Sequence, residues 1–283
     1  MTDPSGLTLL DVLQQRFPES SKTSLRTMLQ SDRVRVNGVP ERNAKRQVRE
    51  SDQIEISARS FRPLDPRVRI VFEDSDLVVV DKAAGLLTVP SPQVQYETAE
   101  SFLNAHYGGR PDEPRIHHVH RLDRDTSGVL VFARNTFARD RLQALFASHD
   151  IERTYVAIVH GKLRESSGVF RSFLAEDHDL RVRSVAGPSE GKEAITHYRV
   201  TASGRRFSIL ELTLETGRRN QIRVHLSEAG HPVVGDTMYG KGRESDLGRL
   251  ALHARDLGLV HPRSGMKLRF TAEVPRAFRE LDL

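Results

Sequence analysis

The sequence predicts an α+β protein, in which a small α+β domain precedes a larger domain with a mixed, largely antiparallel sheet and a central cleft. Strand-like segments after residue 67 are joined by short turns, and few helices are long enough to connect parallel strands. A segment with two prolines at 59–66 separates this region from a different pattern before it. We therefore expect domains at residues 1–58 and 67–283, with a linker at 59–66.

The first domain is predicted to contain two helices and a few strands. Apolar residues recur at helical spacing in residues 7–17, and Ser20 or Ser21 can cap a second helix. Residues 34–38 alternate and end in Asn-Gly, which favours a hairpin. Residues 53–56 form a further strand. Two short helices and short strands give this part of the chain a thin core.

The second domain begins with two strands at residues 70–72 and 77–80, which are joined by a polar turn. Apolar runs with strand character recur later, and one stretch has the spacing of a helix. We expect strands at residues 129–132, 155–159, 209–214 and 268–271, and a helix at 138–146.

Composition narrows the possible functions. The 283 residues carry a formal net charge of +5, which favours a polyanionic partner. Hydrophobic residues make up 37% of the chain, which is enough for a sizeable core. The chain has no cysteine, which excludes disulfides, thiolate metal sites and cysteine nucleophiles. We find no signal-peptide pattern and no run of 18 apolar residues, so a cytoplasmic location is expected, without a membrane partner.

Residues 120–128, His-Arg-Leu-Asp-Arg-Asp-Thr-Ser-Gly, concentrate the chemically reactive side chains. The apolar run at 129–132 follows directly, so the polar cluster is expected at the end of a buried strand, with Thr-Ser-Gly as a tight turn. Charged groups beside a buried strand are typical of an active site.

This segment and four others, in the same order, resemble the RluA-type pseudouridine synthases, which isomerise uridine to pseudouridine inside RNA. The resemblance covers about residues 67 to 274. Ala83 stands where a proline is usual, and Arg219-Asn220 stand where Thr-His is more usual. Residues 230–240 extend the segment Thr216–Leu226. Those segments are Asp81–Leu86, Glu152–Tyr155, Thr216–Leu226 and Leu250–Ala254.

The resemblance implies a role for each site residue. Asp123 matches the catalytic carboxylate, which acts as nucleophile or base. Arg223 matches the arginine that keeps this carboxylate charged. Tyr155 matches the residue that stacks on the target base and assists the final deprotonation at carbon 5. Arg121 matches the arginine that fills the space left by the base, which must leave its stack. The isomerisation exchanges no electrons or atoms overall, so no cofactor and no metal are expected.

The basic residues of the first domain also carry a resemblance. The pattern of a helix, a hairpin and clustered charge is similar to the small RNA-binding domain named after ribosomal protein S-four. Asp32 stands where that family usually has glycine, although Asp tolerates left-handed angles better than most residues. The alternative is a solvated charged face. The residues expected to bind RNA here are Lys22, Arg26, Arg33 and Arg35.

Structural alternatives accompany these assignments. His120, with His117 and His118, has the residue types of a metal site, whereas His225 and His253 are expected to pack or hydrogen-bond. Asp125 and Thr126 are expected to shape the turn. For the remaining site residues, the alternatives are a surface turn with ion pairs for Asp123 and Arg121, an ordinary strand position for Tyr155, and pairing of Arg223 with Glu211 or Glu215.

Three other functions compete with modification of ribosomal RNA, which we expect because an added basic domain is common among the ribosomal-RNA members of the family. The first is a synthase of the same family that acts on transfer RNA. The second is an RNA-binding protein without catalysis. The third is a magnesium-dependent phosphatase, because Asp123-x-Asp125 is similar to a phosphotransfer loop, although a poor strand precedes it. We expect a monomer.

Overall fold

The structure is a computed structural model that describes residues 6–57, 64–94, 96–108, 115–178, 181–240, 242 and 247–279. The chain divides into two compact units. The first comprises Met1–Pro66 and Val89–His117, and the second comprises Arg67–Thr88 and His118–Leu283. Most of the predicted linker lies outside the described residues, and the predicted domain boundaries at 58 and 67 stay a prediction.

The first unit begins with two helices, as predicted. Helix α1 spans Leu9–Arg16, and its first turn is closed by a capping box between Thr8 and Asp11. Helix α2 spans Lys22–Gln30, and its N-cap is Ser21, one of the two predicted caps. Both helices place leucines in a small core of buried residues, to which the strand that follows them contributes two valines.

A three-stranded antiparallel sheet follows, in the order β2-β1-β3. The predicted hairpin is confirmed, because Val36 pairs with Val39 across Asn37 and Gly38, which both have positive φ angles. A later segment of the same unit forms helix α3, which was not predicted from the sequence. The bounds are Val34–Val36 for β1, Val39–Pro40 for β2, Ile54–Ile56 for β3 and Ala99–Tyr107 for α3.

The second unit is built on a sheet whose strands follow the order β10-β9-β11-β12-β8-β13-β7-β5-β4, with β14 paired to β13. Among these strands, the β7–β13 pair is parallel and the other pairs are antiparallel, which confirms the predicted mixed, largely antiparallel sheet. The strand bounds are Val68–Glu73 (β4), Leu77–Lys82 (β5), His117–His118 (β6), Ser127–Ala133 (β7), Glu152–His160 (β8), Ser167–Glu176 (β9), Val182–Val185 (β10), Lys192–Ser203 (β11), Phe207–Leu214 (β12), Leu252–Val260 (β13) and Lys267–Thr271 (β14).

The start of β7 differs from the sequence prediction. Ser127 and Gly128 belong to the strand, and the turn lies earlier, at Arg124 and Asp125. Gly128 has a φ of 117°, and a Cβ atom there would lie 2.0 Å from the carbonyl oxygen of Ala254 on β13. The glycine is therefore required by the close approach of the two parallel strands and not by a turn.

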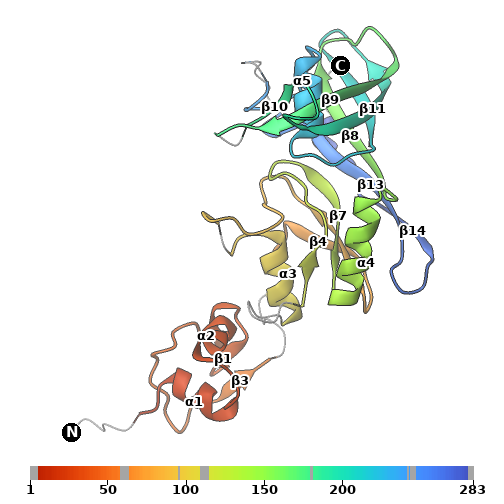
Figure 1. Cartoon of the computed structure of the whole chain (residues 1–283). Helices are drawn as coiled ribbons and strands as arrows, with labels where there is room; N and C mark the ends of the chain where they lie inside the picture. The colour runs from red at the N-terminus through yellow and green to blue at the C-terminus, as the bar shows by residue number, and fades with distance from the viewer. Residues whose placement is uncertain are drawn as a thin grey trace. The chain divides into compact units, whose positions relative to one another are not determined.

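Helices α4 and α5 pack on strands in opposite halves of the strand order (Figure 1). Helix α4, Thr136–Ala147, packs on β7, and helix α5, Gln221–Glu228, packs on β10 and β11. A short helix, α6, spans Arg276–Arg279. The interior strands β5 and β7 are almost wholly buried, which explains their continuous apolar sequences. Within the described residues, no helix is long and apolar enough to cross a membrane.

Candidate active site

Asp123 lies in the loop that enters β7, and hydrogen bonds on both sides of it hold this loop in place. The Leu122 backbone donates to the Thr88 hydroxyl at 3.1 Å, and that hydroxyl donates back to the Leu122 carbonyl at 2.8 Å. On the other side, the carbonyl of Arg124 accepts the Lys82 ammonium at 3.1 Å. The backbone around Asp123 is thus connected to the segment that follows β5.

Lys82 is the anchor of this arrangement. Its side chain is fully buried at the end of β5, and it also donates to the carbonyls of Ala83 at 2.9 Å and Leu86 at 2.8 Å. Burial lowers the pKa of Lys82 to about 7, and the nearby Asp123 carboxylate opposes this change. Because these carbonyls belong to two separate segments, Lys82 connects the end of β5 to the backbone next to Asp123. The sequence pattern placed this lysine in a family segment but indicated no role for it.

A pocket of about 570 Å³ opens beside the loop and brings together the four site residues predicted in the second domain. Asp123 and Arg121 come from the loop before β7, Tyr155 comes from β8, and Arg223 comes from α5. Among the described lining residues, Asp123 is the single carboxylate, while several arginines also line the pocket. The pocket therefore combines one acidic group with a basic surrounding.

Arg223 is held by an aspartate that was not predicted as its partner. Its Nε and Nη2 atoms donate to the two carboxylate oxygens of Asp236 at 2.7 and 2.8 Å, and both residues are buried. Its Nη1 atom donates to the Asn220 side chain at 3.0 Å. The structural alternative for Arg223, an ion pair with Glu211 or Glu215, is not formed. Glu211 pairs with two arginines of the sheet, and Glu215 pairs with His197. The signal that could have identified Asp236 is its place in the family-like segment at 230–240.

The Asp123 carboxyl group lies in an environment that opposes its ionisation. Burial raises the pKa of Asp123 above its ordinary value, and the charges of Arg223, Arg121 and Arg219 act in the opposite direction without cancelling the effect. Among the described residues, no side chain makes an ion pair of 4 Å or less with Asp123. Arg223 therefore influences Asp123 through space while its hydrogen bonds go to Asp236.

Tyr155 lies in the middle of the sheet, where β8 pairs with Leu212 on one side and Ala254 on the other. It is 8% exposed, and its side chain lines the pocket. Burial raises the pKa of the Tyr155 phenol, Arg153 lowers it, and Asp123 raises it further. The ring is therefore fixed by the sheet, and its hydroxyl lies within the electrostatic influence of both charged groups.

The basic residues predicted in the first unit differ in exposure. Lys22 and Arg26 are exposed, one helical turn apart on α2. Arg33 and Arg35 are half-buried, and Arg33 donates to the Ser57 carbonyl at 2.9 Å. Lys22 and Arg26 thus form an exposed basic pair, while Arg33 is tied to the end of the sheet. Their predicted contacts with RNA stay a prediction.

Asp32, the departure from the expected glycine, does adopt a left-handed conformation, with a φ of 52°. Its carboxylate is buried and accepts two hydrogen bonds from Arg42, at 2.7 and 2.8 Å. The turn is thus made by an aspartate whose charge is compensated by one of the basic residues nearby. Arg42 therefore serves the turn and is not free to contact a partner through those two nitrogens.

Three of the histidines singled out in the sequence, His120, His225 and His253, make contacts inside the protein. The Nε2 atom of His120 accepts a hydrogen bond from the Val131 backbone at 3.2 Å, and its ring stacks on Phe146. Burial lowers the pKa of His120 to about 3. The ring nitrogens of His225 and of His253 also meet hydroxyl groups, Thr196 for the former and Ser127 for the latter. The expectation that His225 and His253 hydrogen-bond is confirmed.

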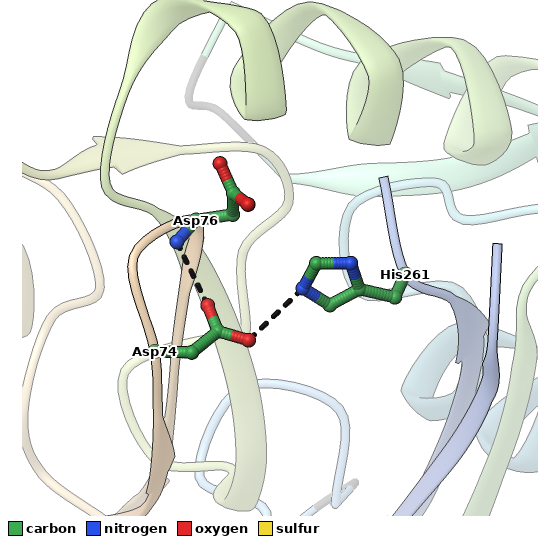
Figure 2. A group of neighbouring side chains, drawn as sticks. All are labelled: Asp74, Asp76 and His261. Atoms are coloured by element: carbon green, nitrogen blue, oxygen red, sulfur yellow. Dashed lines mark hydrogen bonds and ion pairs between the residues drawn. The ribbon is translucent and has the colours of Figure 1, made fainter. Parts of the chain in front are cut away.

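Elsewhere in the described part of the chain, Asp74, Asp76 and His261 have the residue types that bind metals. Figure 2 shows the Asp74 carboxylate between the Asp76 backbone and the His261 ring, at 2.8 and 2.9 Å. The Asp76 carboxylate points elsewhere and accepts a bidentate pair from Arg263 at 2.6 and 2.7 Å, which keeps its pKa well below the usual range. The Asn135 amide also donates to it. Because these oxygens already have strong donors, the group is an ion-pair network that joins two turns.

The family of the chain is shown by comparison with known proteins. The family model of the RNA pseudouridylate synthases matches residues 76–228, which is more than half of the chain, and this range includes the loop of Asp123, strand β8 and all of α5. The chain belongs to this family. It is an RNA pseudouridine synthase, an isomerase, as the resemblance implied.

Individual relatives agree with this assignment. The chain is 40% identical over 213 residues to an uncharacterized RNA pseudouridine synthase of Bacillus subtilis (strain 168), covering 75% of this chain and 70% of the relative. It is 33% identical over 297 residues to the ribosomal large subunit pseudouridine synthase D of Haemophilus ducreyi, covering 99% and 91%. The structure of human RNA pseudouridylate synthase domain containing 4 matches with a TM-score of 0.59 and 27% identity, covering 75% of this chain and 90% of that chain.

Proposed function

We propose that this synthase modifies ribosomal RNA and that Asp123 is its catalytic carboxylate. The observation that carries the proposal for Asp123 is that this carboxylate lines the pocket together with arginines and Tyr155. The proposal of a ribosomal target is supported by the likeness to ribosomal large subunit synthase D over 99% of the chain, which includes the first unit. We infer a cytoplasmic monomer that needs no metal and no cofactor.

The reaction requires three changes of bonding in the nucleoside. The bond between nitrogen 1 of the base and the ribose breaks, and carbon 5 then bonds to the same ribose carbon. Finally, carbon 5 loses its proton and nitrogen 1 gains one. An ionised Asp123 acts in the first changes, as nucleophile or as base. Arg223 supports the charged form of Asp123 through space, and Tyr155 stacks on the base and assists the loss of the carbon 5 proton.

The target uridine must enter the pocket that contains Asp123. We assign the binding and positioning of the RNA to two groups of basic residues. Arg121, an exposed residue that lines the pocket, occupies the space that the target base leaves. In the first unit, Lys22 and Arg26 contact phosphates, with Arg33 and Arg35 nearby. Phosphate contacts hold the RNA in register and do not identify the base. Recognition of the particular uridine is therefore assigned to the second unit.

Two experiments test this function. Asp123→Asn removes the charge and keeps the shape, so product formation from uridine-containing RNA should vanish while RNA affinity stays within a few fold. Measurable turnover by a clean Asn variant would refute the role of Asp123. Activity of the parent should persist in EDTA once monovalent salt replaces magnesium in folding the RNA, whereas a phosphatase would lose its activity.

The target RNA is tested by mapping pseudouridines in total RNA from a deletion strain and its parent. The proposal expects sites in ribosomal RNA to disappear and to return on expression of the parent protein but not of Asp123→Asn. Loss confined to transfer RNA would contradict the ribosomal target and leave the synthase activity intact. If every pseudouridine remained, the alternative of an RNA-binding protein without catalysis would be supported.

A further inference from the structure

Arg153 is a buried cation for which the described part of the chain supplies no matching anion. It is 8% exposed, and its Nη2 atom makes long contacts of 3.4 and 3.3 Å to the backbone carbonyls of Leu214 and Glu215. Its Nε atom is buried and has no hydrogen-bond partner. None of the described residues places a carboxylate within ion-pair distance of it. Burying a guanidinium group without an anion beside it lowers the stability of the folded protein. We therefore expect a negative charge next to Arg153 during part of the catalytic cycle.

The sheet places Arg153 next to one group that can become negative. Arg153 and Tyr155 are two residues apart on β8, so their side chains leave the same face of the strand. Both line the pocket that contains Asp123. Gly217 contributes to the position of the guanidinium, because a Cβ atom there would lie 2.6 Å from Nη1 of Arg153. A larger residue at 217 would therefore displace the arginine.

Among the groups around Tyr155, Arg153 is the cation that acts most strongly on its phenol. The strands on both sides of β8 place the uncharged Leu212 and Ala254 beside it. The loop before β7 contributes the Asp123 carboxylate, and α5 contributes Arg223, whose hydrogen bonds go to Asp236. Of these charges, Arg153 lowers the pKa of Tyr155, whereas burial and Asp123 raise it.

We propose that Arg153 is a positioning residue that stabilises the phenolate form of Tyr155 in the last step of the isomerisation. This inference rests on the proposed function, since it requires Tyr155 to accept the carbon 5 proton. The buried guanidinium then meets its missing negative charge on the adjacent side chain. The charge pair forms in the part of the catalytic cycle in which the tyrosine acts as a base.

The protons of this step balance without an external reagent other than water. The Tyr155 hydroxyl first releases its proton to water and becomes a phenolate. The phenolate oxygen then takes the proton from carbon 5, and the electron pair of that carbon–hydrogen bond returns to the ring. Nitrogen 1 takes one proton from water, which replaces the proton released at the start. The tyrosine ends as a neutral phenol, and no oxidant, reductant or metal takes part.

The test uses the full-length protein and single-turnover kinetics with saturating RNA as a function of pH. Arg153→Gln removes the charge and retains groups that can donate to the Leu214 and Glu215 carbonyls. Its rate at neutral pH should fall about tenfold for each unit by which the pKa of Tyr155 rises. The rate should recover as pH increases, so the whole profile moves to the alkaline side. Arg153→Lys keeps a cation and should retain most of the parent's profile.

A second comparison separates this role from a structural one. In a Tyr155→Phe background there is no phenolate to stabilise, so adding Arg153→Gln should change the remaining rate by less than about twofold. Equal losses from Arg153→Gln in both backgrounds would overturn the proposal, as would an unchanged pH profile. If Arg153→Gln does not fold, Arg153→Lys alone decides, because a parental rate from a shorter cation agrees with the proposal and a loss without any pH shift contradicts it.

Two further outcomes have distinct meanings. If Arg153→Gln weakens RNA binding and lowers the salt slope by a little under one unit, with a parental pH profile, Arg153 meets an RNA phosphate instead and the proposal fails. If Tyr155→Phe retains the parent's rate, the assigned role of the tyrosine in the proposed function fails, whatever Arg153 does. The two failures are therefore told apart by the single tyrosine variant.

Discussion

The buried pair of Arg223 and Asp236 offers the sharpest test of how the site is built. Asp236→Asn keeps the size of the side chain and removes the charge that holds Arg223. In the structure both Asp236 oxygens accept from Arg223, and one of them also accepts from the backbone of Met238 and Tyr239. The amide nitrogen of asparagine cannot accept a hydrogen bond, so at least one of these hydrogen bonds cannot form in the variant.

The expected loss of stability is large because the pair is shielded from water. The side chains of Arg223 and Asp236 are 9% and 0% exposed. Removing one partner of a buried ion pair costs about 3–5 kcal/mol, since the other charge is left uncompensated. At about 2–4 °C per kcal/mol for a protein of 150–250 residues, the melting temperature should fall by roughly 6–20 °C.

The same segment of the chain provides a matched control. Arg219 pairs with Glu176 at 2.8 Å, but here the two side chains are 39% and 38% exposed. Glu176→Gln removes one charge of a surface pair, which is worth about 0–1 kcal/mol. Thermal unfolding of the two variants and the parent at pH 7, with unfolding in urea as a second measurement, gives the comparison directly.

The kinetic consequence should follow the structural one. With Asp236 neutral, Arg223 loses its fixed position relative to Asp123, so the single-turnover rate should fall more than RNA affinity. The reasoning is refuted if Asp236→Asn lowers the melting temperature no more than Glu176→Gln does. It is also refuted if the variant is strongly destabilised but keeps the parent's rate below its melting temperature, because Arg223 would then need no fixed partner.

Three more predictions concern the remaining site residues. Lys22→Glu with Arg26→Glu should weaken RNA binding and lower its salt slope by about 0.7 to 0.9 for each phosphate that the protein no longer neutralises, with little change in the rate at saturating RNA; equal binding at all salt concentrations would mark a solvated surface. Tyr155→Phe should retain binding, because stacking on the ring is worth about 1–3 kcal/mol per base, while the rate falls strongly; equal losses in both would contradict the assigned role. Asp123→Asn should be more stable than the parent at neutral pH, because burial raises the pKa of Asp123 in the folded state and ionisation of the buried carboxyl group then costs the parent stability. Thermal unfolding as a function of pH measures this difference, which should disappear below pH 3.8, where Asp123 is protonated in both the folded and the unfolded parent.

Local patterns in the sequence predicted most of the elements that surround the site. The Asn37-Gly38 turn, the helix capped by Ser21 and the buried run of β7 each depend on neighbours in the chain. Helix α5 was missed because its N-cap, Asn220, has a left-handed conformation and makes no capping hydrogen bond through its side chain. The usual signal of a helix start is therefore absent there.

The role of Gly128 could not be predicted from its neighbours in the sequence. A glycine after Thr-Ser is typical of a turn, yet its φ of 117° serves the contact with Ala254, which lies far along the chain. Lys82 is a second case, because a lysine at the end of a strand is usually exposed and this one is fully buried. Its three carbonyl partners belong to backbone segments that only the folded sheet brings together.

By itself, the sequence determined the class of enzyme and the residues that enter the pocket, because the reactive side chains lie in short segments whose order along the chain is distinctive. Only the tertiary structure decided how those residues are held and charged. Arg223 meets Asp236 and Arg153 meets no carboxylate among the described residues, although acidic residues close in sequence offered other partners. The physical reason is that a buried charge is compensated by whatever the fold places within a few ångströms, and strand register, which brings distant segments together, sets those distances.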